Sequence, residues 1–133
     1  VMRAWDGQIT QMACLTTRCW HVGPQNNFAV GIEHDGFVED GDMWYTERVY
    51  ESSAHLCQSI ASQQTGVNLL QTYDGPGVNG VGPETFLSHS CHKVKGHQQF
   101  DGNSHTDPGP LWNWGHYYRL INPIEPDNGN AVN

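Results

Sequence analysis

The sequence has few basic residues and no long apolar run. Its 133 residues include six Lys and Arg against fourteen Asp and Glu, which gives a net charge of −8 at pH 7 with His neutral. Binding to nucleic acid depends on neutralising phosphates with Lys and Arg, so this balance argues against a nucleic-acid partner. The hydrophobic residues, 37% of the chain, never form the run of about 20 that a transmembrane helix needs. We therefore expect no membrane span.

The chain has four cysteine residues. An even number in so short a chain is typical of an oxidising compartment and favours secretion and disulfide bonds. Four cysteines allow three pairings, of which we expect Cys14–Cys19 across a turn and Cys57–Cys91 between a helix and a strand. Cys14 and Cys19 also have the spacing of a zinc knuckle, but no second close pair follows. A structural zinc site at these cysteines is therefore not expected.

Histidine and the turn-forming residues are abundant. Eight His outnumber the Lys and Arg together, which suits a protein that handles metal ions or protons. With 15 Gly and 7 Pro beside 11% aromatic residues, we expect a core with many turns. A chain of this size forms one domain, assigned to residues 1–121. Residues 122–133 are expected to be a poorly ordered or surface-covering tail.

Two patterns predict strands near the start of the chain. Asp6-Gly7 is a dipeptide typical of a hairpin turn between short strands at 1–5 and 8–13. At residues 28–32, bulky apolar residues alternate with small ones, which predicts a strand with Phe28, Val30 and Ile32 toward the core. Glu33 then faces a cleft.

The helical signals come later. Apolar residues recur at steps of three and four from Thr46 to about Thr65, which predicts a helix that Thr46 caps and Gly66 ends. A second helix is expected over 112–121. Residues 74–83 are predicted to be a long surface loop, and 86–94 a further strand. Strands mixed with helices indicate an α/β or α+β domain.

The strongest chemical signal lies between residues 96 and 110. Gly96-His97 is followed by His105-Thr106-Asp107-Pro108-Gly109-Pro110, which places two imidazoles and a carboxylate within a segment bounded by rigid turns. Either His alone would be better explained as a surface residue beside a capped turn. Together, His97 and Asp107 are candidate ligands of a catalytic zinc. Glu33 is the candidate base for its water, although a solvated strand end would look the same.

The motif Trp20-His21-Val22-Gly23 offers an aromatic wall and a polar group where a sugar or peptide could pack. A Trp of the core is an equally good interpretation of Trp20.

These motifs, with residues 27–37 (NFAVGIEHDGF) and with Trp112 and Trp114, resemble in order and spacing the type 2 N-acetylmuramoyl-L-alanine amidases, relatives of the peptidoglycan recognition proteins. The resemblance runs from Val1 to about Ile121. It implies an α/β fold with a mixed central β-sheet flanked by helices. It also implies a zinc hydrolase that cleaves the amide between N-acetylmuramic acid and L-alanine in peptidoglycan, outside the cell or at the cell wall, whether secreted or delivered by phage.

The resemblance assigns roles to residues. It implies that His97 and Asp107 bind Zn²⁺, that Glu33 is the catalytic acidic residue, and that His105 stabilises the oxyanion. Trp20, His21 and Asn27 are expected to contact the substrate.

One departure concerns the first His ligand of the family, which matching the Asp6-Gly7 turn places immediately upstream of Val1. We expect this sequence to be N-terminally truncated, since a catalytic zinc needs about three protein ligands. Replacement by His21, His34 or His89 is the alternative. Two other functions stay open, a module that binds muropeptide without cutting it and an interaction domain whose His residues merely take up metal.

Overall fold

The computed structural model of the chain describes residues 1–63, 68–71, 93–100 and 104–123, and the main feature of this part is a layer of two packed helices. The longer helix, α2 (Glu47–Gln63), begins after Thr46, whose Oγ1 accepts a hydrogen bond from the amide of Val49 at 3.3 Å. This confirms the predicted helix and its cap. The predicted end at Gly66 lies outside the described residues.

Helix α3 (Trp114–Ile121) is capped by Asn113, whose side-chain oxygen accepts a hydrogen bond from the amide of His116 at 2.9 Å. The helix predicted over 112–121 is thus confirmed, with its start two residues later. Four short helical segments complete the helical structure of the described residues: η1 (Gly23–Asn27), η2 (Val38–Asp40), α1 (Gly41–Trp44) and η3 (His97–Gln99).

The predicted mixed central β-sheet is wrong. The described residues contain two short strands, β1 (Asn68–Gln71) and β2 (Lys93–Val94), which pair in parallel, and two isolated bridges made by Met2. Of the strand predicted over 86–94, only its last two residues lie in the described part. The loop predicted over 74–83 lies outside it, as does most of the predicted tail.

The strand predicted over residues 28–32 is also absent from this described segment. Phe28 and Val30, expected in the core, are 54% and 44% exposed, whereas Ile32 packs against the core as predicted. Alternation sets which face of a strand is buried only when neighbouring strands pair with it. Here the pairing is one bridge, between Met2 and His34 just after the segment.

The turn predicted at Asp6-Gly7 is confirmed, but the strands predicted at residues 1–5 and 8–13 are reduced to isolated bridges. Met2 pairs with Ile9 in an antiparallel bridge, and Gly7 has a φ of +68°, which favours glycine. A side chain at Gly7 would meet Ser52 of α2, so this turn packs closely on the helix.

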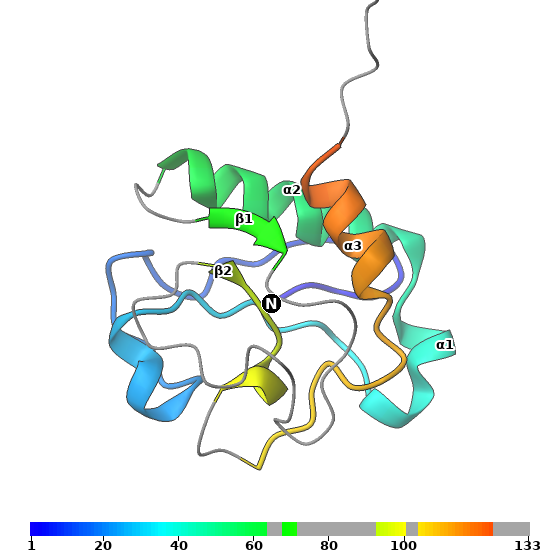
Figure 1. Cartoon of the computed structure of the whole chain (residues 1–133), viewed down its shortest axis with the longest axis horizontal. Coiled ribbons are helices and arrows are strands. Elements are labelled where there is room, and N and C mark those ends of the chain that lie inside the picture. Colours follow the sequence, from blue (N-terminus) through cyan, green and yellow to red (C-terminus); the bar gives the residue numbers. More distant parts are fainter. Residues whose placement is uncertain (64–67, 72–92, 101–103, 124–133) are drawn as a thin grey trace, which may run out of the picture.

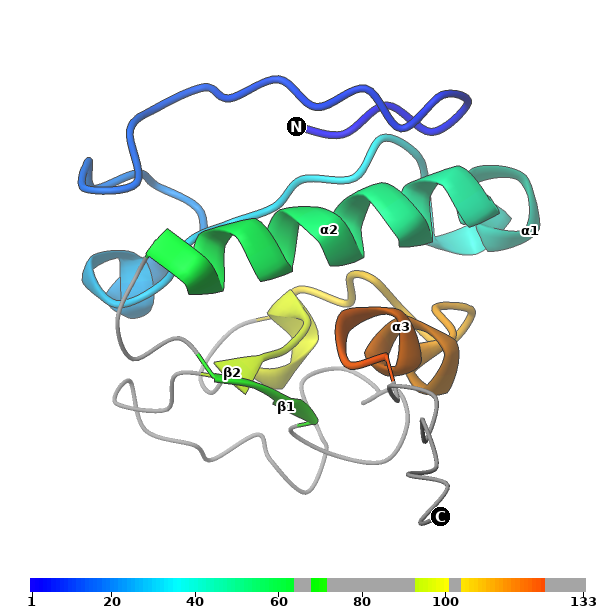
Figure 2. The ribbon, with the colours of Figure 1, turned by 90° about the horizontal axis from the view of Figure 1, so that it is seen from above.

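The core lies between α2, α3 and the segments that flank them. Figure 2 shows α2 between the N-terminal segment on one side and β1, β2 and α3 on the other. Figure 1 shows α3 and β1 side by side against α2. The buried core residues are mostly apolar or aromatic: Met2, Ala4, Val49, Tyr50, Ala54, Cys57, Trp112, Trp114, Tyr117, Tyr118 and Ile121.

The described cysteines are free thiols. Cys14 and Cys19 are exposed and do not form the predicted disulfide, and Cys57 is buried and free. Cys91, its predicted partner, lies outside the described residues.

None of the described helices combines the length and the apolar character that crossing a membrane requires.

Candidate active site

The two motifs that carry the predicted metal ligands interlock through their rigid residues. A side chain at Gly96 would meet the ring of Pro108, with a Cβ only 2.5 Å from Pro108 Cδ, so glycine permits this close approach. The amide of Gln98 donates to the carbonyl oxygen of Asp107 at 3.0 Å. These contacts bring His97 beside Asp107, although nine residues separate them in the chain.

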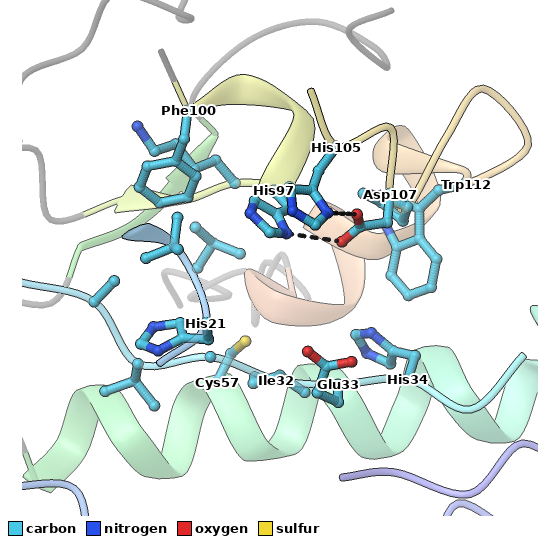
Figure 3. A pocket seen from close by; sticks show the side chains of 18 of the residues that line it. His21, Ile32, Glu33, His34, Cys57, His97, Phe100, His105, Asp107 and Trp112 are labelled. Atoms are coloured by element: carbon cyan, nitrogen blue, oxygen red, sulfur yellow. Dashed lines mark ion pairs between the residues drawn. The ribbon is translucent and has the colours of Figure 1, made fainter. Parts of the chain in front are cut away.

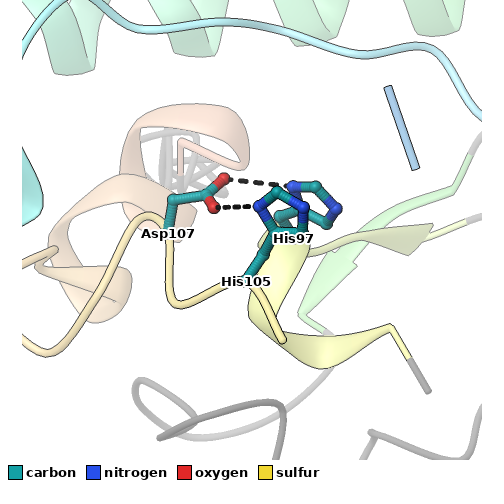
Figure 4. Close-up of side chains that lie close together, drawn as sticks. All are labelled: His97, His105 and Asp107. Carbon is teal, nitrogen blue, oxygen red and sulfur yellow. Dashed lines mark ion pairs between the residues drawn. The ribbon is translucent and has the colours of Figure 1, made fainter. Parts of the chain in front are cut away.

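Figure 4 shows that two imidazoles face the two oxygens of one carboxylate. His97 Nδ1 lies 3.4 Å from Asp107 Oδ2, and His105 Nδ1 lies 3.6 Å from Asp107 Oδ1. Potential ligand atoms of the three residues all lie within 4.8 Å of one another. The cluster predicted from the sequence is therefore brought together.

The two imidazoles are stacked, with ring centroids 3.8 Å apart and planes inclined by 13°. The lone pair of an imidazole nitrogen lies in the plane of its ring. Two nearly parallel planes at this separation do not direct both lone pairs to one ion. In this arrangement one imidazole can ligate an ion together with Asp107 while the other lies beside it.

His97 is the more suitable ligand of the two. Its side chain is 19% exposed, against 59% for His105. Burial lowers the pKa of His97, opposed by the negative charge of Asp107. Since metal binding requires a neutral imidazole, this shift favours the ligating form at neutral pH.

The cluster lies at one wall of a cavity of about 610 Å³, and Glu33 lies at the opposite wall. Figure 3 shows the Glu33 carboxylate directed across the cavity toward His97 and Asp107. Its negative charge is close enough to raise the pKa of His97, although less than burial lowers it. The carboxylate expected in a cleft thus faces the candidate metal ligands.

The predicted substrate-contacting residues divide into two groups. Trp20 and His21 line the cavity, and Trp20 is 84% exposed with the guanidinium of Arg18 5.0 Å from its ring centre. Asn27 is exposed at the end of η1 and is not among the residues that line the cavity.

Among the described residues, the alternative ligands His21 and His34 lie outside the cluster. His34 Nε2 is 2.8 Å from Ser53 Oγ, and His21 Nδ1 is 3.1 Å from the carbonyl oxygen of Cys19. His89 lies outside the described residues. The histidine predicted upstream of Val1 is not part of this sequence, so it stays a prediction.

Two residues that support the site were missed. The Tyr45 hydroxyl donates to the carbonyl oxygen of Pro108 at 2.5 Å, and burial raises the pKa of Tyr45 to about 12. Asn26 Oδ1 accepts from the amides of His21 and Val22 at 3.0 and 2.8 Å. Asn26 was detectable as a turn-forming residue near Trp20-His21. Tyr45 had no such signal, because its partner is 63 residues away.

The comparisons with known proteins agree on one family. The family model described as N-acetylmuramoyl-L-alanine amidase matches residues 2–110. N-acetylmuramoyl-L-alanine amidase A of Achromobacter lyticus is 40% identical over 124 residues, which cover 92% of this chain and 66% of that protein. The 1,6-anhydro-N-acetylmuramyl-L-alanine amidase AmpD of Citrobacter freundii is 22% identical over 126 residues, 89% of this chain and 54% of its own length.

The chain thus spans between about half and two thirds of the length of these relatives. No solved structure matches it significantly.

Proposed function

Because the chain belongs to the N-acetylmuramoyl-L-alanine amidase family, we propose that it hydrolyses the amide between N-acetylmuramic acid and L-alanine in peptidoglycan, with a zinc ion as cofactor. The observation that most supports this is the spacing of His97 and Asp107 opposite Glu33 across one cavity.

The residues present fit a zinc ion. Ligands about 2.0–2.2 Å from a tetrahedral zinc lie about 3.4 Å from each other, and His97 Nδ1 and Asp107 Oδ2 are 3.4 Å apart. Imidazole and carboxylate are both ordinary zinc ligands. His97 and Asp107 would hold the ion and supply two of its protein ligands. When bound, zinc polarises the scissile carbonyl and makes water a stronger acid.

The chain's own residues then move the protons. Glu33 accepts a proton from the water that attacks the carbonyl carbon. As the carbon–nitrogen bond breaks, Glu33 gives this proton to the leaving amine of L-alanine. His105, stacked on His97, donates a hydrogen bond to the carbonyl oxygen as negative charge develops there.

Substrate binding is assigned to the open side of the cavity. Trp20 offers an exposed aromatic face for a sugar ring, and His21 lies beside it in the lining. Asn27 contacts the parts of the substrate that extend beyond the cavity, since it is exposed nearby in η1.

We propose an extracellular or cell-wall location because the substrate is there. The described cysteines are free thiols and therefore do not support an extracellular location. The proposed location depends on the substrate alone. Fractionation of cells that express the protein, with antibody detection, tests it.

The deciding experiment compares Asp107→Ala with Asp42→Ala, which removes an exposed carboxylate of α1 outside the cavity. Purified peptidoglycan is the substrate, and both new L-alanine amino groups and bound zinc are measured. Asp107→Ala is expected to lose both activity and zinc, and Asp42→Ala to keep both. Full activity in Asp107→Ala would contradict the metal role.

The same assay separates the proposal from its alternatives. Binding of muropeptide by the zinc-loaded wild type without release of amino groups would indicate a recognition module. Zinc uptake with neither binding nor hydrolysis would indicate an interaction domain that takes up metal.

A further inference from the structure

A chain of hydrogen bonds leads from the helix layer to the residue next to Glu33. Ser53 Oγ lies 2.8 Å from His34 Nε2 and 2.7 Å from the hydroxyl of Tyr117, which lies 3.1 Å from Cys57 Sγ. Ser53 is fully buried on α2, and Tyr117 is buried on α3. These hydrogen bonds therefore join both helices to the segment that carries Glu33.

The hydroxyls of Ser53 and Tyr117 can each donate to one neighbour and accept from the other, so these hydrogen bonds can run in either direction. A neutral His34 joins them as acceptor or as donor at Nε2, according to its tautomer. Burial lowers the pKa of His34 to about 4, which keeps the ring neutral at physiological pH.

Helix formation does not account for Ser53. A serine inside a helix ordinarily points to solvent or bonds a carbonyl of its own helix, whereas this hydroxyl contacts two other segments. The position is also enclosed, since Ser53 is 0% exposed. This buried contact with His34 and Tyr117 requires a small side chain that carries a hydroxyl.

The backbone around Glu33 is held as well. The amide of Met2 donates to the carbonyl oxygen of Glu33 at 2.7 Å, and the carbonyl of Met2 accepts from Asp35 at 2.8 Å. The His34 ring also lies against Trp112, with centroids 5.0 Å apart. His34 thus joins a fixed backbone to the helix layer, while Glu33 beside it faces the cavity (Figure 3).

We propose that Ser53 and His34 are positioning residues, which act through their hydrogen bond to hold the Glu33 carboxylate toward the candidate metal ligands. This inference rests on the proposed amidase function, in which Glu33 is the general base.

The test uses Ser53→Ala, His34→Leu and the double variant in the zinc-loaded protein, with peptidoglycan fragments as substrate. Misplacement of a catalytic group by about 1 Å costs up to about 100-fold in rate. We expect each single variant to lower kcat about 10- to 100-fold with KM and zinc content unchanged. The double variant should be no worse than the poorer single variant, because both remove the same bond.

Two further variants separate positioning from general weakening of the fold. His34→Gln keeps a side-chain amide that can reach the Ser53 hydroxyl, and it is expected to recover most of the lost kcat. Val49→Ala removes buried volume on the same helix, one turn before Ser53, without removing any of these hydrogen bonds, and its kcat per folded molecule is expected to match the wild type.

Multiplicative losses in the double variant, or wild-type kcat in Ser53→Ala, would overturn the proposal. A wild type without hydrolysis would instead contradict the amidase function. Positioning is then decided by NMR, with Ser53→Ala expected to shift the amide signals of Glu33 and Asp35 and to leave those of Lys95 and Gly96 in place. Unchanged signals at Glu33 and Asp35 would overturn positioning by itself.

Discussion

The aromatic core and the candidate metal cluster are held by different kinds of interaction. In the aromatic core, Tyr117 and Trp112 are buried among other aromatic rings, with centroids 5.0 Å apart. In the candidate metal cluster, His97 and Asp107 are placed by a backbone hydrogen bond and by the close approach of Gly96 to Pro108. Apolar burial stabilises the aromatic core, whereas the cluster exposes polar groups to the cavity. Substitutions should therefore separate into those that change stability and those that change chemistry.

The largest effect is expected for Glu33→Gln, which keeps the shape of the side chain and removes the base. A general base contributes about 100- to 10,000-fold to the rate, so kcat should fall by about that factor. The melting temperature should change little, because Glu33 is exposed. Steady-state kinetics and calorimetry measure the two effects, with Glu39→Gln, an exposed residue of η2, as the control. Equal losses in both variants would contradict the assignment.

A loss of stability without a loss of activity is expected for Ile121→Ala at the end of α3. Ile121 is 2% exposed, and removing its buried methyl groups should lower the free energy of unfolding by about 2–5 kcal/mol. Denaturant titration measures this, and kcat of the folded molecules should stay at the wild-type value. Arg119→Ala, on the exposed side of the same helix, is the control. A large loss of kcat in Ile121→Ala would show that the core and the site are coupled.

A pH titration of stability sharpens the comparison at His34, which lines the cavity and contacts Ser53 and Trp112 of the core. The pKa of His34 is lowered by burial from about 6.5 to about 4 in the folded state. The unfolded chain therefore binds more protons between these values, and the free energy of unfolding falls as pH drops from about 6.5 to 4. The loss attributable to His34 is about 2–3 kcal/mol.

The measurement is denaturant titration at several pH values in wild type and His34→Gln. His97 contributes in the same direction in both proteins, so the difference between them isolates His34. A difference that does not vary with pH would contradict the burial of the ring.

The smallest effect is expected for Thr46→Ala at the start of α2. Thr46 accepts from the amide of Val49 and donates to the carbonyl oxygen of Ala4 at 2.7 Å. Loss of such a cap costs about 1 kcal/mol. Thermal unfolding measures it, with Thr46→Ser, which retains the hydroxyl, expected to recover most of the loss. No change in Thr46→Ala would mean that the cap is dispensable.

The helices were predictable because their signals are local. The apolar stripe of α2, its cap at Thr46 and the aromatic steps of α3 can all be read within one segment. The proximity of His97, His105 and Asp107 was predictable for a similar reason, since two short motifs bounded by Gly and Pro hold them. The lack of a central sheet among the described residues was not predictable, because the alternation at residues 28–32 does not reveal whether partner strands exist. The links from Ser53 to His34 and from Tyr45 to Pro108 join distant segments, and no periodic pattern marks them.

Gly31 has a consequence for engineering the cavity. A methyl group there would lie 2.7 Å from a ring carbon of His21, with no room for both. Because a side chain moves more easily than backbone, we expect Gly31→Ala to displace the imidazole of His21. A single hydrogen-to-methyl exchange would thus remodel the mouth of the cavity and leave the far wall with its candidate metal ligands in place.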